Sequence, residues 1–587
     1  MKRVRHYIGG FPQFGGLFGL PLTAIAVAVV IFSTGCTTPP PVPTDPIDAC
    51  ALPPATFAGW FQSGAVSLNG VVNPANSLVN LSPNCGFYEW SEQMFMWLTS
   101  PAPSAYGGGA HIFDSPSFFD VSPEDAVTGK RTFLSHTPGI IRAMPLRAAQ
   151  FGPHRLPVAT DRFGTVFEFR PPDPNLKPML RDPSGQLVEV AHARLEQGRL
   201  VLFDQAGKPI AAQHAPASLS AADQKEGTRH AQKFIVDRLS IFVDPFFSVI
   251  DVEQGQANGS QVLEAQTASN GSLIYYATMV NDVYAYFLTG VKDGVITTST
   301  PGQFPTTSSD LNAIVSFATA HGKGTPPFPD PNALAIEVKS SWVLAAGLPN
   351  LSSYITMTAT IPTYDQSNPS AWTQNGQQTV QLAMVGMHVV GSTANHPEMV
   401  WATFEHVANT PAAAYSYNST TGTKTVAQPT SGAWVFATAG GSTTYNLPHM
   451  FFSGPPNSIQ PISPFALSPS DTLRANPWGI DGSNTPGNNA SNTEVISMNN
   501  HVRTLMASGD VRGNYIMTGA TWTIPTFPPS ISNLGVGTNR LANSTMETYH
   551  QGVSNCFTCH VGSPNGYNPN GLSHVFGGAS DGMQPLF

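Results

Sequence analysis

The chain has 587 residues, of which 41% are hydrophobic and only 11% are charged, and its formal net charge is −9. Soluble domains usually carry about 25% charged residues, so this surface is poor in charge. The acidic balance, without a long run of like charges, argues against a nucleic-acid partner, which requires a basic face. Glycine and proline, at 53 residues each, favour turn-rich β structure and exclude a coiled coil or a helical bundle.

The amino terminus has the layout of a secretory signal. Basic residues at positions 2, 3 and 5 precede an apolar stretch that is densest over residues 24–32, and small residues follow up to Cys36. The apolar run is shorter than the roughly 20 residues of a membrane-spanning helix. The sequence around Cys36 resembles the lipobox of bacterial lipoproteins, although Ser33 stands where that family usually has Leu. An ordinary signal peptide with a nearby cysteine is the alternative.

The lipoprotein resemblance implies a location. Residues 1–35 would be removed, Cys36 would be acylated, and the Pro-rich residues 36–49 would act as a spacer between the membrane and the folded body. Such a protein sits on the periplasmic side of the bacterial cell envelope. Thr37, in place of the Asp that retains lipoproteins at the inner membrane, favours the outer membrane. No later segment offers 18 consecutive apolar residues.

Two further cysteines, Cys50 and Cys85, form an even pair in a chain expected to be exported. In an oxidising compartment a disulfide is the expected state of such a pair, and two buried thiols are the alternative. The segment 85–99 is predicted to be a helix. Its core-facing stripe would consist of Phe87, Trp90, Met94 and Trp97.

The remaining cysteines lie in the pattern C-x-x-C-H, formed by Cys556, Cys559 and His560. This is the signature of covalent haem attachment, in which the two thiols bond to the haem and the histidine binds the iron. A zinc site would need four ligands, and the sequence has no second cysteine pair. A thioredoxin-like redox pair would need a preceding strand in a βαβ unit, whereas the flanking residues here are Asn, Ser and Gly.

The motif resembles c-type cytochromes over its own length and the segment before it. The resemblance implies one covalent haem c with His560 as the proximal iron ligand. Ser544 and Glu547 fit a capping box, so we predict a helix that begins at Ser544 and continues through Tyr549 and His550. The residues after His560 are too few to enclose a porphyrin, so we expect the large body of the protein to supply most of the pocket walls.

The tail contains two candidates for the distal iron ligand, Met583 and, close behind it, His574. Both can reach around the ring edge from His560. A methionine thioether would raise the reduction potential, as in other cytochromes c. Met546 and His550 lie before the motif, nearer the proximal side, and rank lower.

Two runs in the body, residues 380–390 and 400–407, alternate as β-strands do. A turn signal at residues 395–397 lies between them, so we expect a β-hairpin or two adjacent strands. The residues expected to share one face of the first run are Leu382, Met384, Gly386 and His388. In the second run, one face is expected to carry Ala402, Phe404 and His406, and the other Trp401, Thr403 and Glu405. His388 and His406 are both core histidines, or one of them is a distal ligand or an acid–base group above an open iron. With an open iron, His406 or Glu405 nearby would make peroxide chemistry plausible.

The predicted fold class is mainly β with some helices (α+β), with a short helical haem c segment at the C-terminus packed against a large β-rich body. The expected regions are 50–163 with helix, loop and disulfide, 164–330 with strands and helices, 331–540 rich in strands, and 541–587 for haem attachment. Strand-like runs cover 164–170, 187–192, 199–204, 333–344 and 354–362. Residues 273–288 and 310–320 are expected to be helical, and the polar stretches 415–432 and 476–499 to be loops.

Residues 386–411 and 541–560 together resemble an uncharacterised family of large monohaem c-type cytochrome proteins. The favoured hypothesis is a membrane-anchored periplasmic monohaem cytochrome that transfers single electrons. The alternative is a haem-dependent oxidoreductase of peroxidase or oxygenase type, with a substrate pocket in the β-rich body. A third hypothesis is a lipoprotein whose haem serves sensing. The sequence identifies no catalytic residues, no redox partner and no substrate.

Overall fold

The computed structural model describes the folded body of the protein with several gaps along the chain. The described residues are 42–122, 130–142, 150–151, 157–160, 166–168, 179–181, 187–189, 192–196, 199–203, 206, 208–209, 232–236, 239–243, 249–251, 261–298, 303–453, 458–462, 464–480, 482–524, 535–549, 551, 556–560, 569–573, 575–576 and 583–587. The predicted signal peptide, Cys36, His550 and His574 lie outside them. Within these ranges, no helix has the length and apolar character needed to cross a membrane.

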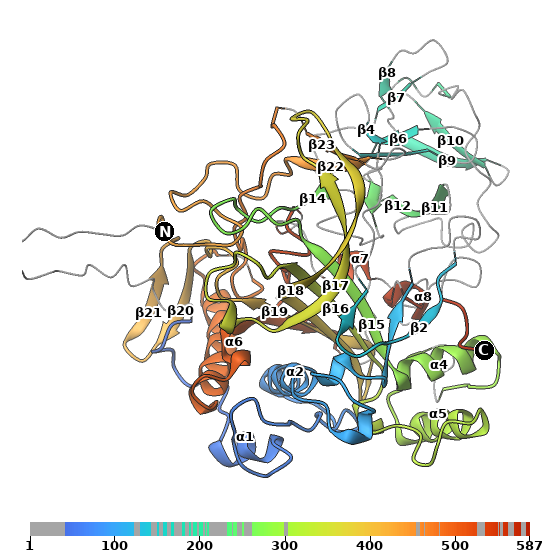
Figure 1. Ribbon diagram of the computed structural model, residues 1–587, viewed down its shortest axis with the longest axis vertical. Helices are drawn as coiled ribbons and strands as arrows, with labels where there is room; N and C mark the ends of the chain where they lie inside the picture. The colour runs from blue at the N-terminus through green and yellow to red at the C-terminus, as the bar shows by residue number, and fades with distance from the viewer. Residues whose placement is uncertain are drawn as a thin grey trace, which may run out of the picture. The chain divides into compact units, whose positions relative to one another are not determined.

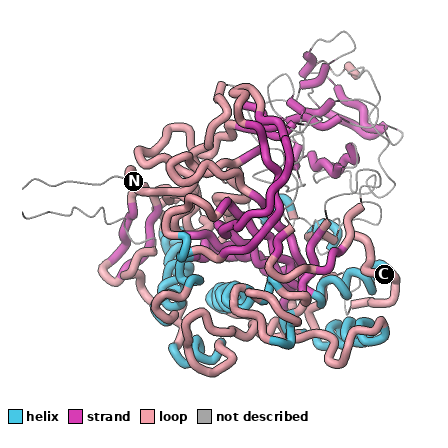
Figure 2. Tube along the Cα trace, in the orientation of Figure 1, coloured by secondary structure: helices cyan, strands magenta, loops and turns pink. Residues whose placement is uncertain are grey.

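The structure is mainly β, as predicted (Figure 2). A 13-stranded sheet is built around the long strand β18 (Trp372–Thr393), which pairs with β16 (Ile336–Leu344), β17 (Thr356–Asp365), β19 (His396–His406) and β23 (Ser458–Pro461). All pairings are antiparallel except that of β17 with β3. The other strands of this sheet are β1 (Phe118–Val121), β2 (Phe133–Ser135), β3 (Ile140–Ile141), β14 (Gln261–Val262), β15 (Tyr275–Asn281), β22 (Met450–Ser453), β24 (Tyr515–Trp522) and β25 (Val536–Gly537). The sheet therefore joins strands from three of the regions expected from the sequence.

The β18–β19 hairpin predicted from the sequence is confirmed. Thr393 lies opposite His396, and Asn395 in the turn has φ 66°, a left-handed conformation that asparagine tolerates better than most residues. The first half of β18 is largely exposed and forms with β17 the long curved ribbon seen in Figure 1. In contrast, β19 is buried along its whole length, so both of its faces are covered.

Helices cover one face of the hairpin, which we call the helix face. The predicted helix is confirmed as α2 (Asn84–Leu98), and its expected stripe is buried. Phe95 of α2 stacks on Phe404 of β19 with ring centroids 4.2 Å apart, and Phe87 stacks on Trp522 of β24 at 4.0 Å. The helices α1 (Pro54–Trp60) and α6 (Pro486–Leu505) pack beside α2 (Figure 1).

The helix α6 corrects the expectation that residues 476–499 form a loop. Its Asn-rich sequence has weak helix propensity, but two of its buried asparagines find backbone partners elsewhere in the fold. The Asn492 side chain donates to the Ser416 carbonyl of β20 (Tyr415–Ser419), and the Asn499 side chain donates to the Met517 carbonyl of β24. Thr485 caps the helix by accepting a hydrogen bond from Asn488 N–H. Tertiary contacts therefore outweigh the local preference.

Residues 273–288 also differ from the expectation of a helix. They are divided between β15 and α4 (Asp282–Lys292), and the change occurs at Asn281, whose side chain accepts the Tyr284 N–H as an N-cap. The expected helix at 310–320 is confirmed as α5 (Ser308–Ala320). The short helices are η1 (Ser104–Tyr106), η2 (Ile112–Asp114), η3 (Pro331–Ala333), η4 (Leu351–Ser353), η5 (Val511–Asn514), α7 (Cys556–Cys559) and α8 (Pro569–Leu572).

Small sheets complete the described structure. The expected strands at 164–170, 187–192 and 199–204 are present, over their described residues, as β6 (Val166–Glu168), β8 (Leu187–Glu189) and β10 (Arg199–Phe203). Those at 333–344 and 354–362 are present as β16 and β17. Residues 415–432 contain the hairpin β20 (Tyr415–Ser419) and β21 (Gly422–Val426) where only a loop was expected. The remaining small sheets consist of β4 (Gln150–Phe151) with β5 (Pro157–Thr160) and β6 (Val166–Glu168), β7 (Met179–Arg181) with β8 (Leu187–Glu189), β9 (His192–Glu196) with β10 (Arg199–Phe203), and β11 (Gln232–Val236) with β12 (Leu239–Val243) and β13 (Val249–Asp251).

Candidate functional site

The C-x-x-C-H motif folds as a single helical turn. The helix α7 contains both cysteines, and the His560 N–H donates to the Cys556 carbonyl at 2.9 Å. The two cysteines are therefore the first and last residues of one helical turn. Cys556 is half-buried, and Phe557 is fully buried among apolar residues of the body.

His560 is held from two directions. Its Nδ1 atom lies 2.8 Å from the carbonyl oxygen of Leu572 in α8, and its ring centroid lies 4.1 Å from that of Trp401 in β19. An imidazole that donates its Nδ1–H to a carbonyl carries its lone pair on Nε2, and metal-binding histidines are usually oriented by such a bond. The histidine is 7% exposed. The residues present therefore fit the proximal ligand of a haem c.

A row of directly opposed residues crosses the sheet beneath the C-terminal tail. Trp401 of β19 lies opposite Val390 of β18, Val390 lies opposite Glu337 of β16, and Glu337 lies opposite Val280 of β15. The tail contacts this row at two points, because His560 packs on Trp401 and the Ser573 hydroxyl lies 2.5 Å from Glu337 Oε2. Burial raises the pKa of Glu337 to about 7.

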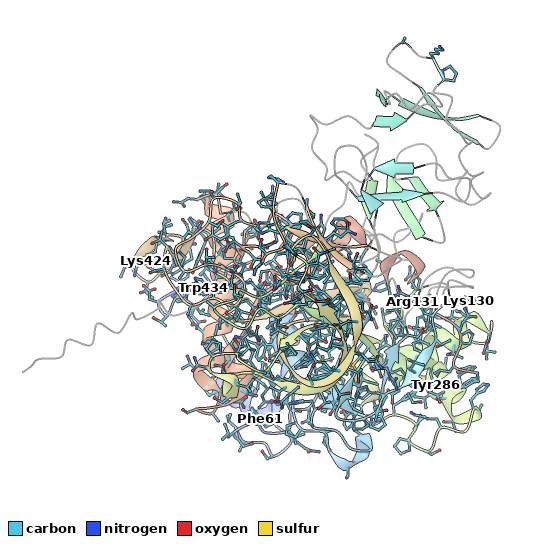
Figure 3. The ribbon with its side chains drawn as sticks, turned by 45° about the horizontal axis from the view of Figure 1, so that its top comes forward. Phe61, Lys130, Arg131, Tyr286, Lys424 and Trp434 are labelled. Carbon is cyan, nitrogen blue, oxygen red and sulfur yellow. A yellow bond between two sulfur atoms is a disulfide. The ribbon has the colours of Figure 1, made fainter. Side chains whose placement is uncertain are left out.

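The tail beyond α8 packs into an apolar cluster of the body. Phe576 contacts the rings of Phe287 in α4 and of Phe304, with centroids 5.8 and 5.9 Å apart, and Figure 1 shows α8 next to α4. Met583 is fully buried in the same cluster as Phe557 and Leu572. It forms a parallel bridge with Arg131, which Figure 3 shows beside Lys130. The body thus covers the described part of the tail, and Met583 remains a candidate distal ligand.

Residues 541–551, which we call the approach segment, precede the motif, and the described ones lie on the face of the hairpin opposite the helix face. Ser544 donates to the buried carboxylate of Glu405 twice, from its backbone N–H at 2.7 Å and from its Oγ at 2.6 Å. Arg474 donates to the same carboxylate from Nε and Nη2 at 3.1 and 2.9 Å. The Asn543 side chain donates to Thr403 Oγ1 at 2.8 Å.

The approach segment is not the helix predicted from the capping-box pattern, because its described residues form turns. The Ser544 hydroxyl is used by Glu405 and does not cap a helix. Glu547 reaches back to the Asn543 N–H at 2.8 Å and also pairs with His388 of β18, whose Nε2 lies 3.0 Å from Glu547 Oε1. Burial raises the pKa of Glu547, but His388, Lys339 and the Asn543 N–H together outweigh this effect and hold the pKa below its usual value. His388 therefore anchors the segment.

A register shift in β18 corrects one predicted face. Gly386 lies opposite Ser341, but Met384 lies opposite Trp342, so one extra residue stands between them as in a β-bulge. Leu382 and Met384 consequently pack with the helix-face core, whereas Gly386 and His388 face the approach segment. A Cβ atom at Gly386 would lie 2.7 Å from Ser341 Oγ and 2.8 Å from Thr545 Oγ1.

The predicted alternation in β19 is confirmed, and it determines the roles of Glu405 and His406. Trp401, Thr403 and Glu405 face the approach segment and the motif. His406 lies on the other face, where its ring stacks on Tyr354 at 3.7 Å, its Nε2–H donates to the Ser353 carbonyl and its Nδ1 accepts from the Ala408 N–H. Burial lowers the pKa of His406 to about 3. It is therefore a satisfied core histidine.

The predicted disulfide is present, and three residues near the motif have contacts that the sequence did not indicate. The disulfide between Cys50 and Cys85 is confirmed, with Cα atoms 5.3 Å apart. Sequence reasoning placed Trp401 on a face without giving it a role, and it missed Glu337 and Ser573. Glu337 alternates with the apolar residues Ile336 and Val338, as a solvent-facing strand residue would, so the sequence did not distinguish it. Among the described residues, no cluster of three or more His, Cys, Asp or Glu side chains is placed to hold a metal ion.

No protein-family model, curated protein or solved structure matches this chain.

Proposed function

We propose that this chain is a c-type cytochrome that binds one haem covalently through Cys556 and Cys559, with His560 as the proximal iron ligand. The observation that carries the proposal is the hydrogen bond from His560 Nδ1 to the Leu572 carbonyl, within a C-x-x-C-H motif that folds as one helical turn. This bond fixes the tautomer and orientation that iron ligation needs. The haem, when bound, would supply one-electron redox chemistry.

The residues of the chain have defined tasks in this proposal. Trp401 supports the His560 ring, and the apolar cluster around Phe557 and Leu572 excludes water. The approach segment holds the motif against the sheet through Glu405 and His388. Met583 is proposed as the distal ligand, with His574 as the alternative. Electron transfer needs little rearrangement of the protein, and the many buried contacts around the motif suit a rigid carrier.

The test is an absorption spectrum of the purified mature protein, followed by extraction with acidified organic solvent. We expect a haem c spectrum and pigment that stays with the protein, because thioether bonds survive this treatment. The Cys556→Ser/Cys559→Ser double variant serves as the control and should lose the covalent pigment. A colourless wild-type protein, or pigment that is extracted from it, contradicts the proposal.

Carbon monoxide separates electron transfer from haem enzymology. A six-coordinate carrier should keep its reduced spectrum in carbon monoxide, whereas an open iron, as in a peroxidase or oxygenase, should bind the gas and change the spectrum. A Met583→Ala variant should acquire carbon monoxide binding if Met583 is the distal ligand. A spectral change in the wild-type protein would favour the enzyme hypothesis.

The proposed location is the periplasmic side of the bacterial outer membrane, with a lipid anchor at Cys36. Acylation of this cysteine should place the protein in the outer-membrane fraction. A Cys36→Ala variant should be processed poorly or released. Equal recovery of the two proteins in the outer-membrane fraction would contradict lipidation at this residue. The redox partner is expected to be another protein or a small molecule of the envelope.

A further inference from the structure

The carbonyl that orients His560 is itself held by a buried polar group of the sheet. Leu572 and Ser573 share one planar peptide unit, so the position of Ser573 fixes the direction of the Leu572 carbonyl. The Ser573 side chain is fully buried. Its Oγ lies 2.5 Å from Glu337 Oε2 and 2.7 Å from the hydroxyl of Tyr284 in α4.

The Ser573 hydroxyl uses its full hydrogen-bonding capacity. A hydroxyl offers one donor and two acceptor positions. With Glu337 ionised, the single hydrogen of Ser573 goes to the carboxylate, and Tyr284 then donates to Ser573 Oγ. The backbone N–H groups of Val575 and Phe576 also point at Ser573 Oγ, at 3.2 and 3.3 Å. A protonated Glu337 would instead donate to the same oxygen, so the connection persists in either state.

Glu337 would destabilise the fold at its buried position without the hydrogen bond from Ser573 of the tail. It lies in β16 with β15 on one side and β18 on the other, and it is 8% exposed. Burying a carboxyl group costs free energy that a hydrogen-bonded partner must offset. Because both neighbouring strands fix the backbone of β16, Glu337 gives the tail an anchor that does not move with α8.

We propose that Glu337 and Ser573 are positioning residues that hold the Leu572 carbonyl and thereby set the orientation and basicity of the His560 imidazole. The inference rests on the proposed function for its effect on iron, but the hydrogen-bonded chain from Glu337 to His560 belongs to the protein alone. A well-formed Nδ1–H bond makes the imidazole a stronger donor to the oxidised metal. Weakening the chain should therefore raise the reduction potential.

The test compares Glu337→Leu with the conservative Glu337→Gln. The leucine variant removes the acceptor, and we expect a higher reduction potential in a spectroelectrochemical titration and altered electron paramagnetic resonance g values. The glutamine variant keeps an oxygen that can accept from Ser573, and it should restore both readouts toward wild type. Glu92→Leu is the control. It removes a buried carboxylate from α2, away from the tail, and should leave both readouts unchanged.

A second readout does not depend on haem. In the Cys556→Ala/Cys559→Ala protein, nitrogen chemical shifts of selectively labelled histidine should report the Nδ1–H tautomer of His560. Addition of Glu337→Leu, or of Ser573→Ala if the first variant does not fold, should produce a mixture of tautomers. An unchanged tautomer together with an unchanged potential would overturn the inference. If no haem is found but the tautomer depends on Glu337, the proposed function fails while the positioning role stands.

Discussion

Glu405 Oε2 lies 2.6 Å from Ser544 Oγ, so a buried carboxylate in the sheet holds the chain where it approaches the C-x-x-C-H motif. The same oxygen receives two bonds from Arg474, and the other carboxylate oxygen receives the Ser544 N–H. Glu405, Ser544 and Arg474 therefore form a buried hydrogen-bond network within the apolar body. The approach segment is therefore fixed by specific buried hydrogen bonds rather than by helix propensity.

Replacement of Arg474 by methionine should strongly destabilise the protein. Glu405 is fully buried, and without the guanidinium its charge is left without a cationic partner. Breaking one side of a buried pair costs about 3–5 kcal/mol of the free energy of unfolding. Urea denaturation measures the change. The control is Lys424→Met, which removes an exposed partner of Asp45 and should cause no measurable change; equal effects of the two variants would contradict the role of burial.

Gly386→Ala should loosen the approach segment. The added methyl group would approach the hydroxyls of Ser341 and Thr545 within 2.8 Å, so one element has to shift. Overpacking of this kind typically costs about 1–3 kcal/mol. Gly59→Ala is the matched control, because its position in α1 has no heavy atom within 4 Å of the new Cβ and alanine favours a helix. Faster hydrogen exchange in residues 541–551 of the Gly386 variant is the local readout, and unchanged exchange would argue against a tight contact.

The disulfide should contribute measurably to stability. The chain-entropy model for a loop of sequence separation 35 gives about 3–4 kcal/mol. The Cys50→Ala/Cys85→Ala variant should unfold at correspondingly lower urea concentration. A reducing agent should bring the wild-type protein to the same midpoint and leave the variant unaffected. A wild-type midpoint that does not respond to complete reduction would show that the bond closes an already ordered loop without stabilising it.

Glu264 should make stability decrease as the pH rises. Burial raises the pKa of its carboxyl from 4.5 to about 8, and no described residue bonds its Oε2 atom. Between these two values the folded protein binds more protons than the unfolded chain, so the free energy of unfolding falls with increasing pH. Glu264→Gln, which cannot ionise, should reduce this slope between pH 5 and pH 8. Denaturation curves at several pH values test the prediction, and an unaltered slope would refute it.

His406 contributes in the opposite direction. Burial lowers its pKa from 6.5 to about 3, so the unfolded chain binds the extra proton between these values and stability falls as the pH drops below about 6.5. His406→Gln should make the protein less sensitive to acid, although the loss of stacking on Tyr354 lowers its stability at neutral pH. The two effects are separated by comparing unfolding midpoints at pH 4 and pH 7. The same acid sensitivity in both proteins would show that other groups control it.

The sequence by itself determined the features that depend on local pattern or on elementary chemistry. These are the C-x-x-C-H motif, the Cys50–Cys85 pairing, the helix α2, the turn at Asn395 and the alternation of β19. Each is specified by residues within one element or by the small number of cysteines. The mainly β fold class also followed from composition and from the spacing of apolar residues.

Only the tertiary structure decided how the site is held. The bulge beside Gly386, the helical state of the Asn-rich residues in α6 and the turns of the approach segment all depend on partners that are remote in sequence. Glu337 and Ser573 are adjacent in space although most of the C-terminal half of the chain separates them. Local propensities amount to fractions of a kcal/mol per residue, whereas a buried polar group without a partner costs several times more. The fold therefore follows the long-range hydrogen bonds where the two disagree.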